Sequence, residues 1–194
     1  MRRSYLIVLL GLAAFLGAGA VWLRGSGMTS RRHPWPVEER VARAARSFLM
    51  PRAMRDAVNP VPASPEVTRA GMEHFADHCA SCHANDGSGQ TPLGQAMFPR
   101  APDMRRNPTQ AMTDGELFCD IENGIPFSGM AAWGTGTADG ERSTWELVRF
   151  IRHLPQIADD EVRQMAQLNP KSTADEKRKK DIDDFLAGTK KAIR

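Results

Sequence analysis

The stretch Cys79-Ala80-Ser81-Cys82-His83 decides the fold of this chain. Two cysteines three residues apart lie on one turn of a helix, so both thiols face the same side. Each thiol can add to one vinyl group of a haem, and the two thioether bonds then hold the porphyrin edge-on to the helix. The imidazole that follows can bind the iron. The motif predicts one covalent haem c, attached through Cys79 and Cys82, with His83 as an iron ligand.

Two other chemistries use a similar cysteine pair. A redox-active dithiol needs a thioredoxin-like strand before the pair, and no strand pattern precedes Cys79. A zinc knuckle needs two more ligands at suitable spacing; His74 and His78 lie upstream, but the chain has no second cysteine pair. Haem attachment is therefore the favoured interpretation.

The second axial ligand has to come from elsewhere in the chain, and Met130 is the best candidate. It stands in the short stretch 128–133, Ser-Gly-Met-Ala-Ala-Trp, between two expected helices and about fifty residues after the motif. A thioether on such a loop can reach the iron face opposite His83 if the helices enclose the haem. Met97, Met104 and Met112 are the competitors, and apolar packing is the alternative role for each methionine.

Helix-capping signals predict an all-α domain with long loops. Ser64-Pro65-Glu66 is a helix start, with an N-cap serine and a proline in the first turn. Capping boxes at residues 113–116 and 143–146 predict two further helices, the first ending at Gly124 and the second at Pro155. A short helix is expected over 159–168. No segment alternates as a strand does, and residues 85–107 are expected to be mostly loop.

The first residues predict a membrane anchor. Arg2 and Arg3 precede an uncharged run of twenty residues, Ser4 to Leu23, which as a helix spans roughly 30 Å and is long enough to cross a bilayer. The small residues 18–20, Ala-Gly-Ala, leave cleavage as the alternative. We expect a signal-anchor over residues 1–24.

Three further regions complete the expected organisation. Residues 25–63 form a linker that contains one helix, Val37 to Met50, whose apolar residues recur at helical spacing. The helix is expected to lie on the haem domain, which extends over residues 64–169; a partner site on its apolar face is the alternative. The last region, 170–194, is a polar charged tail with at most a solvated helix.

Composition excludes some functions and fits the haem interpretation. The net charge is +3 and the basic residues are scattered among acids, so nucleic acid is not an expected partner. Three cysteines are too few, and odd in number, for a disulfide scaffold. Only one Tyr, four Trp and eight Phe are available to build a core, so a group other than side chains is expected to fill part of it.

On the basis of these motifs, the sequence from about Ser64 to Leu154 resembles the small monohaem class I cytochromes c. The apolar anchor and the basic helix of the linker extend the resemblance to membrane-tethered bacterial proteins of this type. The resemblance implies that Gly71 and Phe75 pack against an aromatic residue of the C-terminal helix, Phe150 or Trp145. The sequence departs from the family at Ala84, where glycine is common, at Ala131, where proline is common, and at Cys119, where an aromatic is common.

The resemblance implies a compartment and a function. Haem is attached to such proteins outside the bacterial cytoplasm, so the domain is expected to face the periplasm from the inner membrane, or to be released there if the anchor is cleaved. The leading hypothesis is a non-enzymatic one-electron carrier that docks briefly on redox protein partners through its haem edge. The alternatives are an electron-transfer subunit of a larger membrane oxidoreductase, a haem enzyme, and a haem sensor with an open sixth site.

Overall fold

Helices make up all the regular structure of the described residues in this computed structural model. It describes the whole chain apart from residues 1, 27–28, 31, 172 and 188–194, so parts of the expected linker and tail lie outside the described residues. In chain order the α-helices are α1 (Arg2–Ser26), α2 (Pro36–Leu49), α3 (Arg52–Arg55), α4 (Pro65–His74), α5 (Ala80–His83), α6 (Pro92–Ala96), α7 (Asp114–Asn123), α8 (Ala138–His153), α9 (Asp159–Leu168) and α10 (Thr173–Leu186). The predicted all-α fold is confirmed, and it is consistent with a cytochrome c-like helical domain.

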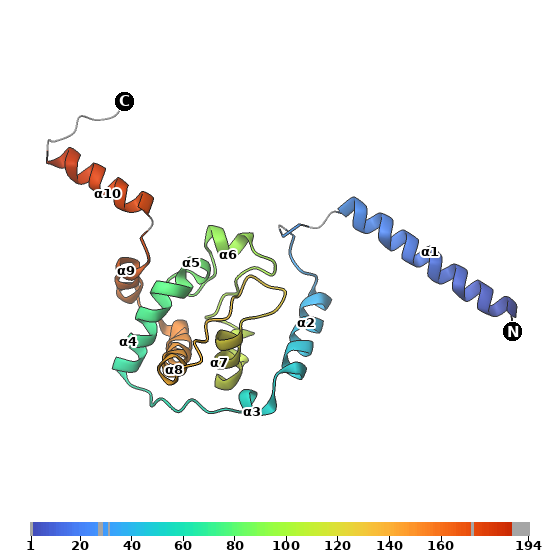
Figure 1. The fold of residues 1–194 in the computed structure, drawn as a ribbon, viewed down its shortest axis with the longest axis horizontal. Helices are drawn as coiled ribbons and strands as arrows, with labels where there is room; N and C mark the ends of the chain where they lie inside the picture. Colours follow the sequence, from blue (N-terminus) through green and yellow to red (C-terminus); the bar gives the residue numbers. More distant parts are fainter. Residues whose placement is uncertain (1, 27–28, 31, 172, 188–194) are drawn as a thin grey trace.

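Helices α4 and α8 cross and form the centre of the domain (Figure 1). Helix α4 begins as predicted, because the Ser64 hydroxyl accepts a hydrogen bond from the backbone N–H of Val67. Gly71 allows the close approach, since a Cβ there would lie only 2.9 Å from the Cβ of Phe150 and would clash with the Glu146 backbone. Phe150 is therefore the aromatic partner that the resemblance implied, and its ring centroid lies 5.2 Å from that of Phe75.

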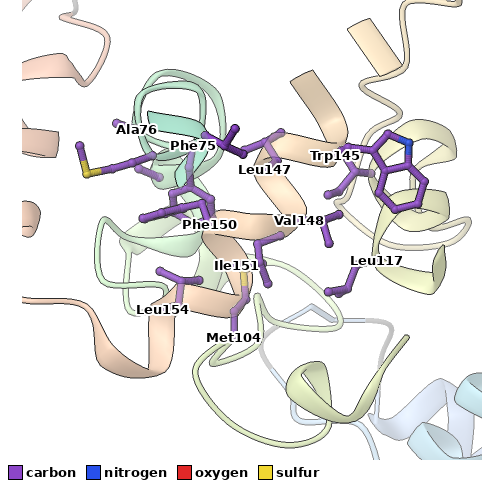
Figure 2. Packing of buried hydrophobic residues seen from close by; sticks show 14 of the residues in the cluster. Phe75, Ala76, Met104, Leu117, Trp145, Leu147, Val148, Phe150, Ile151 and Leu154 are labelled. Carbon is purple, nitrogen blue, oxygen red and sulfur yellow. The ribbon is translucent and has the colours of Figure 1, made fainter. Parts of the chain in front are cut away.

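The buried core surrounds this crossing. Figure 2 shows α8 side chains meeting Phe75, which directly follows α4, together with Leu117 of α7 and Met104 of the loop before α7. Trp145, the other candidate for the α4 contact, instead stacks on Phe118 of α7 with the ring centroids 4.1 Å apart. One face of α8 thus packs on α4 and the other on α7.

Helix α7 begins at the predicted capping box and ends at Gly124. The Thr113 hydroxyl accepts from the Glu116 N–H at 3.1 Å, and the Glu116 carboxylate accepts from the Thr113 N–H at 2.9 Å. The same hydroxyl donates to the backbone carbonyl of Arg55 at 2.6 Å, which attaches α3 to the start of α7. Gly124 has φ of 67°, a conformation that favours glycine.

Thr113→Ala is expected to destabilise the domain by about 1–2 kcal/mol, because it removes an N-cap and the contact to Arg55 together. The measurement is thermal or denaturant unfolding of the purified protein. Thr113→Ser keeps the hydroxyl and is the matched control, expected within about 0.5 kcal/mol of the parent. Equal losses in the two variants would contradict a role for the hydroxyl.

The expected second capping box is wrong. Helix α8 begins at Ala138, where the Thr137 hydroxyl accepts from the Gly140 N–H at 3.1 Å. The Ser143 hydroxyl lies inside the helix and donates to the Asp139 carbonyl at 3.0 Å. Two serine or threonine caps were available, and the earlier one is used because the intervening residues continue the helix with acidic side chains in its first turn. Asp159–Leu168 is confirmed as a helix.

The N-terminal helices lie outside the core. Within the described residues, α1 contains one span, Tyr5–Gly25, that is long and apolar enough to cross a membrane, and none of that span is buried. Signal sequences share these properties. Helix α2 has no buried residue, so its apolar face does not lie on the haem domain. It reaches the domain through Arg46, which pairs with Asp120 of α7 at 3.0 Å.

Candidate functional site

The cysteine–histidine motif lies at the end of one long helical run. Helix α4 continues through a π-helical turn, Phe75–Cys79, into α5. Such turns are rare and occur often at functional sites. Cys79, Cys82 and His83 therefore follow the buried α4 face, which is anchored on α8 through Phe75. Both thiols are free and half-buried.

The loop after the motif folds back over its last turn. The Thr91 hydroxyl donates to the Cys82 carbonyl at 3.0 Å, and the Gly89 N–H donates to the His83 carbonyl at 2.8 Å. Gly94 closes the loop, since its Cα faces the Cys82 carbonyl at a distance that leaves no room for a side chain. The helix-end carbonyls of the motif are thereby satisfied by the chain itself.

His83 is half-buried, and its imidazole is unprotonated at neutral pH. Burial lowers the pKa of its imidazole to about 4, so at neutral pH the ring is in the form that binds a metal ion. Its ring lies 6.4 Å from that of Phe75. Nδ1 is buried and has no hydrogen-bond partner within the described chain. A buried polar atom without a hydrogen-bond partner costs free energy in a core made of protein alone. The unpaired imidazole therefore fits a ring that binds a prosthetic group.

The thiol chemistry argues against a redox dithiol. Burial raises the pKa of the Cys79 thiol to about 12, and the nearby Cys82 contributes to this rise. Reactive dithiols need the opposite, a thiolate stabilised at neutral pH. A zinc site also finds no support, because among the residues that the structure describes no three His, Cys, Asp or Glu side chains gather as a metal-binding group. The donor set fits covalent haem better than either alternative.

Met130 lies on a loop that runs back along α7. The Met130 carbonyl accepts from the Ile125 N–H at 3.0 Å, and its own N–H donates to the Ser128 hydroxyl at 3.1 Å. Three residues after Met130, the Trp133 N–H donates to the carbonyl of Ile121 at 3.0 Å. The Met130 side chain is half-buried and packs at the edge of the core.

The same loop reaches the motif helix. The Trp133 ring packs edge-on against the imidazole of His78, with centroids 5.3 Å apart. His78 immediately precedes Cys79, so this contact joins the Met130 loop to the helix that carries the motif. The sequence indicated both residues but not their contact; the only signal was that Trp133 closely follows Met130.

The competing methionines lie in different surroundings. Met104 is buried in the core, and Met112 lies 3.8 Å from the Arg46 guanidinium, measured to its sulfur. Both therefore serve packing. Met97 lies against Gly129, where a Cβ would be 3.0 Å from the Met97 Cγ. Met97 is the competitor closest to the expected ligand loop.

Ala84, directly after the motif, has a backbone conformation that suits glycine. Its φ is 61° and its ψ is 158°, a region that residues with a Cβ rarely adopt and that costs about 1–3 kcal/mol. This explains why glycine is common at this position in proteins that the sequence resembles, and it makes Ala84 a strained residue. The turn is held by the loop hydrogen bond to His83 described above, so the strain persists.

Ala84→Gly is accordingly expected to stabilise the protein by about 1 kcal/mol, because the relief of strain exceeds the added freedom of the unfolded chain. For a domain of this size that raises the melting temperature by about 4–8 °C. Ala70→Gly, on the regular helix α4, is the control and is expected to lower it. A melting temperature for Ala84→Gly at or below the parent value would contradict the strain.

Cys119, the third cysteine, is a buried structural thiol. Its side chain is 8% exposed on α7, and its sulfur lies 3.8 Å from that of Met54. Burial raises its pKa, which keeps the thiol protonated and unreactive at neutral pH. A small packing residue fits this geometry, and a reactive thiol does not.

Comparison with known families adds one finding. Residues 66–151 match the family described as cytochrome C oxidase, cbb3-type, subunit III. The match supports a c-type cytochrome. It includes Cys79, Cys82, His83 and Met130 and supports a haem-based role in electron transfer. A search of the curated proteins finds no relative that matches the chain.

Proposed function

We propose that this protein is a one-electron carrier with a single covalent haem c. Cys79 and Cys82 hold the haem through thioether bonds, His83 is one axial ligand and Met130 is the other. The observation that supports this best is the contact of Trp133 with His78, because it brings the Met130 loop to the helix that ends in the motif. A haem c bound there supplies an iron that alternates between Fe(III) and Fe(II).

The chain's own residues give the site its properties. Phe75 and the loop hydrogen bonds around His83 orient the imidazole, and burial keeps it unprotonated. The Met130 backbone is fixed by its bonds to Ile125 and Ser128. A thioether opposite an imidazole favours Fe(II) and raises the reduction potential, which suits reversible electron transfer.

The loop chemistry argues against a haem enzyme or an open-site sensor. Such sites need a polar group free to act on a ligand at the iron. Ser128 is the polar side chain nearest in sequence to Met130, and its hydroxyl already donates to the Ile125 carbonyl at 2.7 Å and accepts from the Met130 N–H. The residues that follow, Ala131 and Ala132, are apolar.

We further propose that the domain faces the periplasm from the bacterial inner membrane, with α1 retained as its anchor. Covalent haem attachment to such proteins occurs outside the cytoplasm, which supports this orientation. Cleavage at the small residues 18–20 would instead give a soluble periplasmic protein. N-terminal sequencing of the mature chain distinguishes the two.

A second candidate function is an electron-transfer subunit of a larger membrane oxidase. The family match favours it, because that family is named for a subunit of cytochrome c oxidase. The same haem would then pass electrons within a fixed complex and not to a diffusing partner. Co-purification of oxidase subunits with the detergent-solubilised protein is the expected result for this candidate, and a lone protein is the expected result for the free carrier.

The proposed haem attachment is tested by counting thiols. After denaturation the holoprotein is expected to titrate one free thiol per chain, Cys119, because the two motif thiols are consumed. Its mass is expected to exceed that of the polypeptide by one haem, and a redox titration is expected to show a single one-electron transition. Three titratable thiols and a mass without the added group would overturn the proposal.

A further inference from the structure

Helix α2 carries an exposed apolar strip along its whole length. Val37, Val41 and Phe48 recur at helical spacing, with Leu49 beside them. Phe48 is 86% exposed and Leu49 is 76% exposed. We call these four side chains the α2 apolar strip. A strip of this kind on an amphipathic helix is typical of a surface that another phase or molecule covers.

The haem domain does not cover the strip, because α2 contacts the domain through its polar side. Arg46 pairs with Asp120 at 3.0 Å, and its guanidinium also lies 3.8 Å from the sulfur of Met112. At about 100° per residue, Arg46 lies roughly 160° around the helix from Phe48. Val37, Val41 and Phe48 therefore face away from the domain that Arg46 holds, while Leu49, about 60° around the helix from Arg46, lies at the edge of the strip.

The start of α2 lies against the end of the expected membrane span. Trp22, near the end of the apolar run of α1, contacts Trp35, the residue before α2, with ring centroids 5.5 Å apart. Tryptophan is enriched at the boundary between lipid and water. If α1 spans the bilayer, this contact holds the first turn of α2 at that boundary.

The charges of α2 fit a lipid surface. Arg40 follows one edge of the strip, about 60° around the helix from Val37, and Arg43 lies on the polar side within 3.5 Å of Glu39 on the preceding turn. The Arg40 side chain can extend to phosphate headgroups while its stem lies along the apolar face. Acidic residues of α2, by contrast, lie near its start, at positions 38 and 39.

We propose that α2 lies in the headgroup region of the bilayer that α1 spans, with the α2 apolar strip buried toward the acyl chains. The opposite side then holds the haem domain at the membrane surface through Arg46 and Asp120. This inference depends on retention of α1 as an anchor and does not depend on the haem. It implies that the domain has one fixed orientation on the membrane. A domain attached only through a flexible linker would adopt many orientations.

The test measures water access to α2 in the full-length holoprotein, alone in nanodiscs that contain phosphatidylglycerol. In a Cys119→Ser background, Phe48→Cys reports on the strip. Val58→Cys is the matched control, since Val58 is an apolar side chain outside α2 that is 84% exposed. The probe is a water-soluble maleimide–polyethylene glycol, read as a gel shift. Both substitutions replace exposed side chains, and an unchanged visible spectrum confirms that each variant folds.

We expect the thiol at position 48 to react at least about tenfold more slowly than that at position 58, because lipid excludes the probe. A second reporter, Val41→Cys, is expected to be protected in the same way, and Glu39→Cys on the polar side is expected to react fast. Equal rates at positions 48 and 58 would overturn the proposal. Protection that arises only when oxidase-containing membranes are added would overturn it in favour of a protein partner.

The background variant without an added cysteine separates this proposal from the haem assignment. It is expected not to react, because the motif thiols are consumed by haem. Reaction at Cys79 and Cys82, identified by peptide mass, would contradict the haem attachment while leaving the comparison of positions 48 and 58 intact.

Discussion

Replacing Met130 with alanine is expected to remove the far-red charge-transfer band of a methionine–Fe(III) bond from the visible spectrum of the purified protein. The midpoint potential is expected to fall at the same time, because a thioether stabilises Fe(II) relative to a water or nitrogen ligand. Axial ligation sets haem potentials over about 0.8 V, and we expect a fall on the order of 0.1 V or more. Both effects are measured on one sample by a spectroscopic redox titration.

Met97→Ala is the matched control. Its side chain lies against Gly129, one residue before Met130, so the variant disturbs the same loop and deletes the same kind of side chain. We expect the far-red band to persist in Met97→Ala. If the band instead survives in Met130→Ala and is lost in Met97→Ala, the ligand is Met97. A high-spin ferric spectrum in the parent protein would contradict the carrier function altogether.

The elements that the sequence predicted well are those governed by local chemistry. Ser64 and Thr113 cap the helices that they were expected to cap, and Gly124 ends α7, since a hydroxyl acceptor or a positive φ acts within a few residues. The contact of Gly71 and Phe75 with α8 followed from the resemblance, which left Phe150 and Trp145 as alternative partners, and the structure shows that Phe150 is the partner.

What the sequence could not predict depends on contacts between distant residues. The helical spacing of the apolar residues predicted the strip on α2, but spacing does not show what covers a helix face. The pairing of Arg46 with Asp120 directs the apolar strip away from the domain. The contact between Trp133 and His78 joins two segments 55 residues apart. The start of α8 was misplaced because Thr137 and Ser143 are both competent caps, and only the folded helix shows which one is used.

Phe150→Ala is expected to have the largest effect on stability of any single substitution considered. The side chain is 0% exposed at the crossing of α4 and α8, and truncation of a buried phenylalanine costs about 3–5 kcal/mol. For a domain of roughly one hundred residues the melting temperature falls by more than about 10 °C. The measurement is thermal unfolding of the holoprotein, followed by far-UV circular dichroism.

The loss is also expected to reach the haem site. Phe150 supports Phe75, and the Phe75 ring lies 6.4 Å from that of His83, so a cavity at position 150 loosens the residue that orients the imidazole. A weaker far-red band below the unfolding transition is the expected sign.

The matched control is Phe127→Ala, the same substitution at a side chain that is 100% exposed. It is expected to change stability by less than about 0.5 kcal/mol. Similar melting temperatures in the two variants would show that the crossing of α4 and α8 does not hold this domain together. Because the crossing positions the motif helix, that result would also remove the physical reason for expecting His83 to be oriented by the fold.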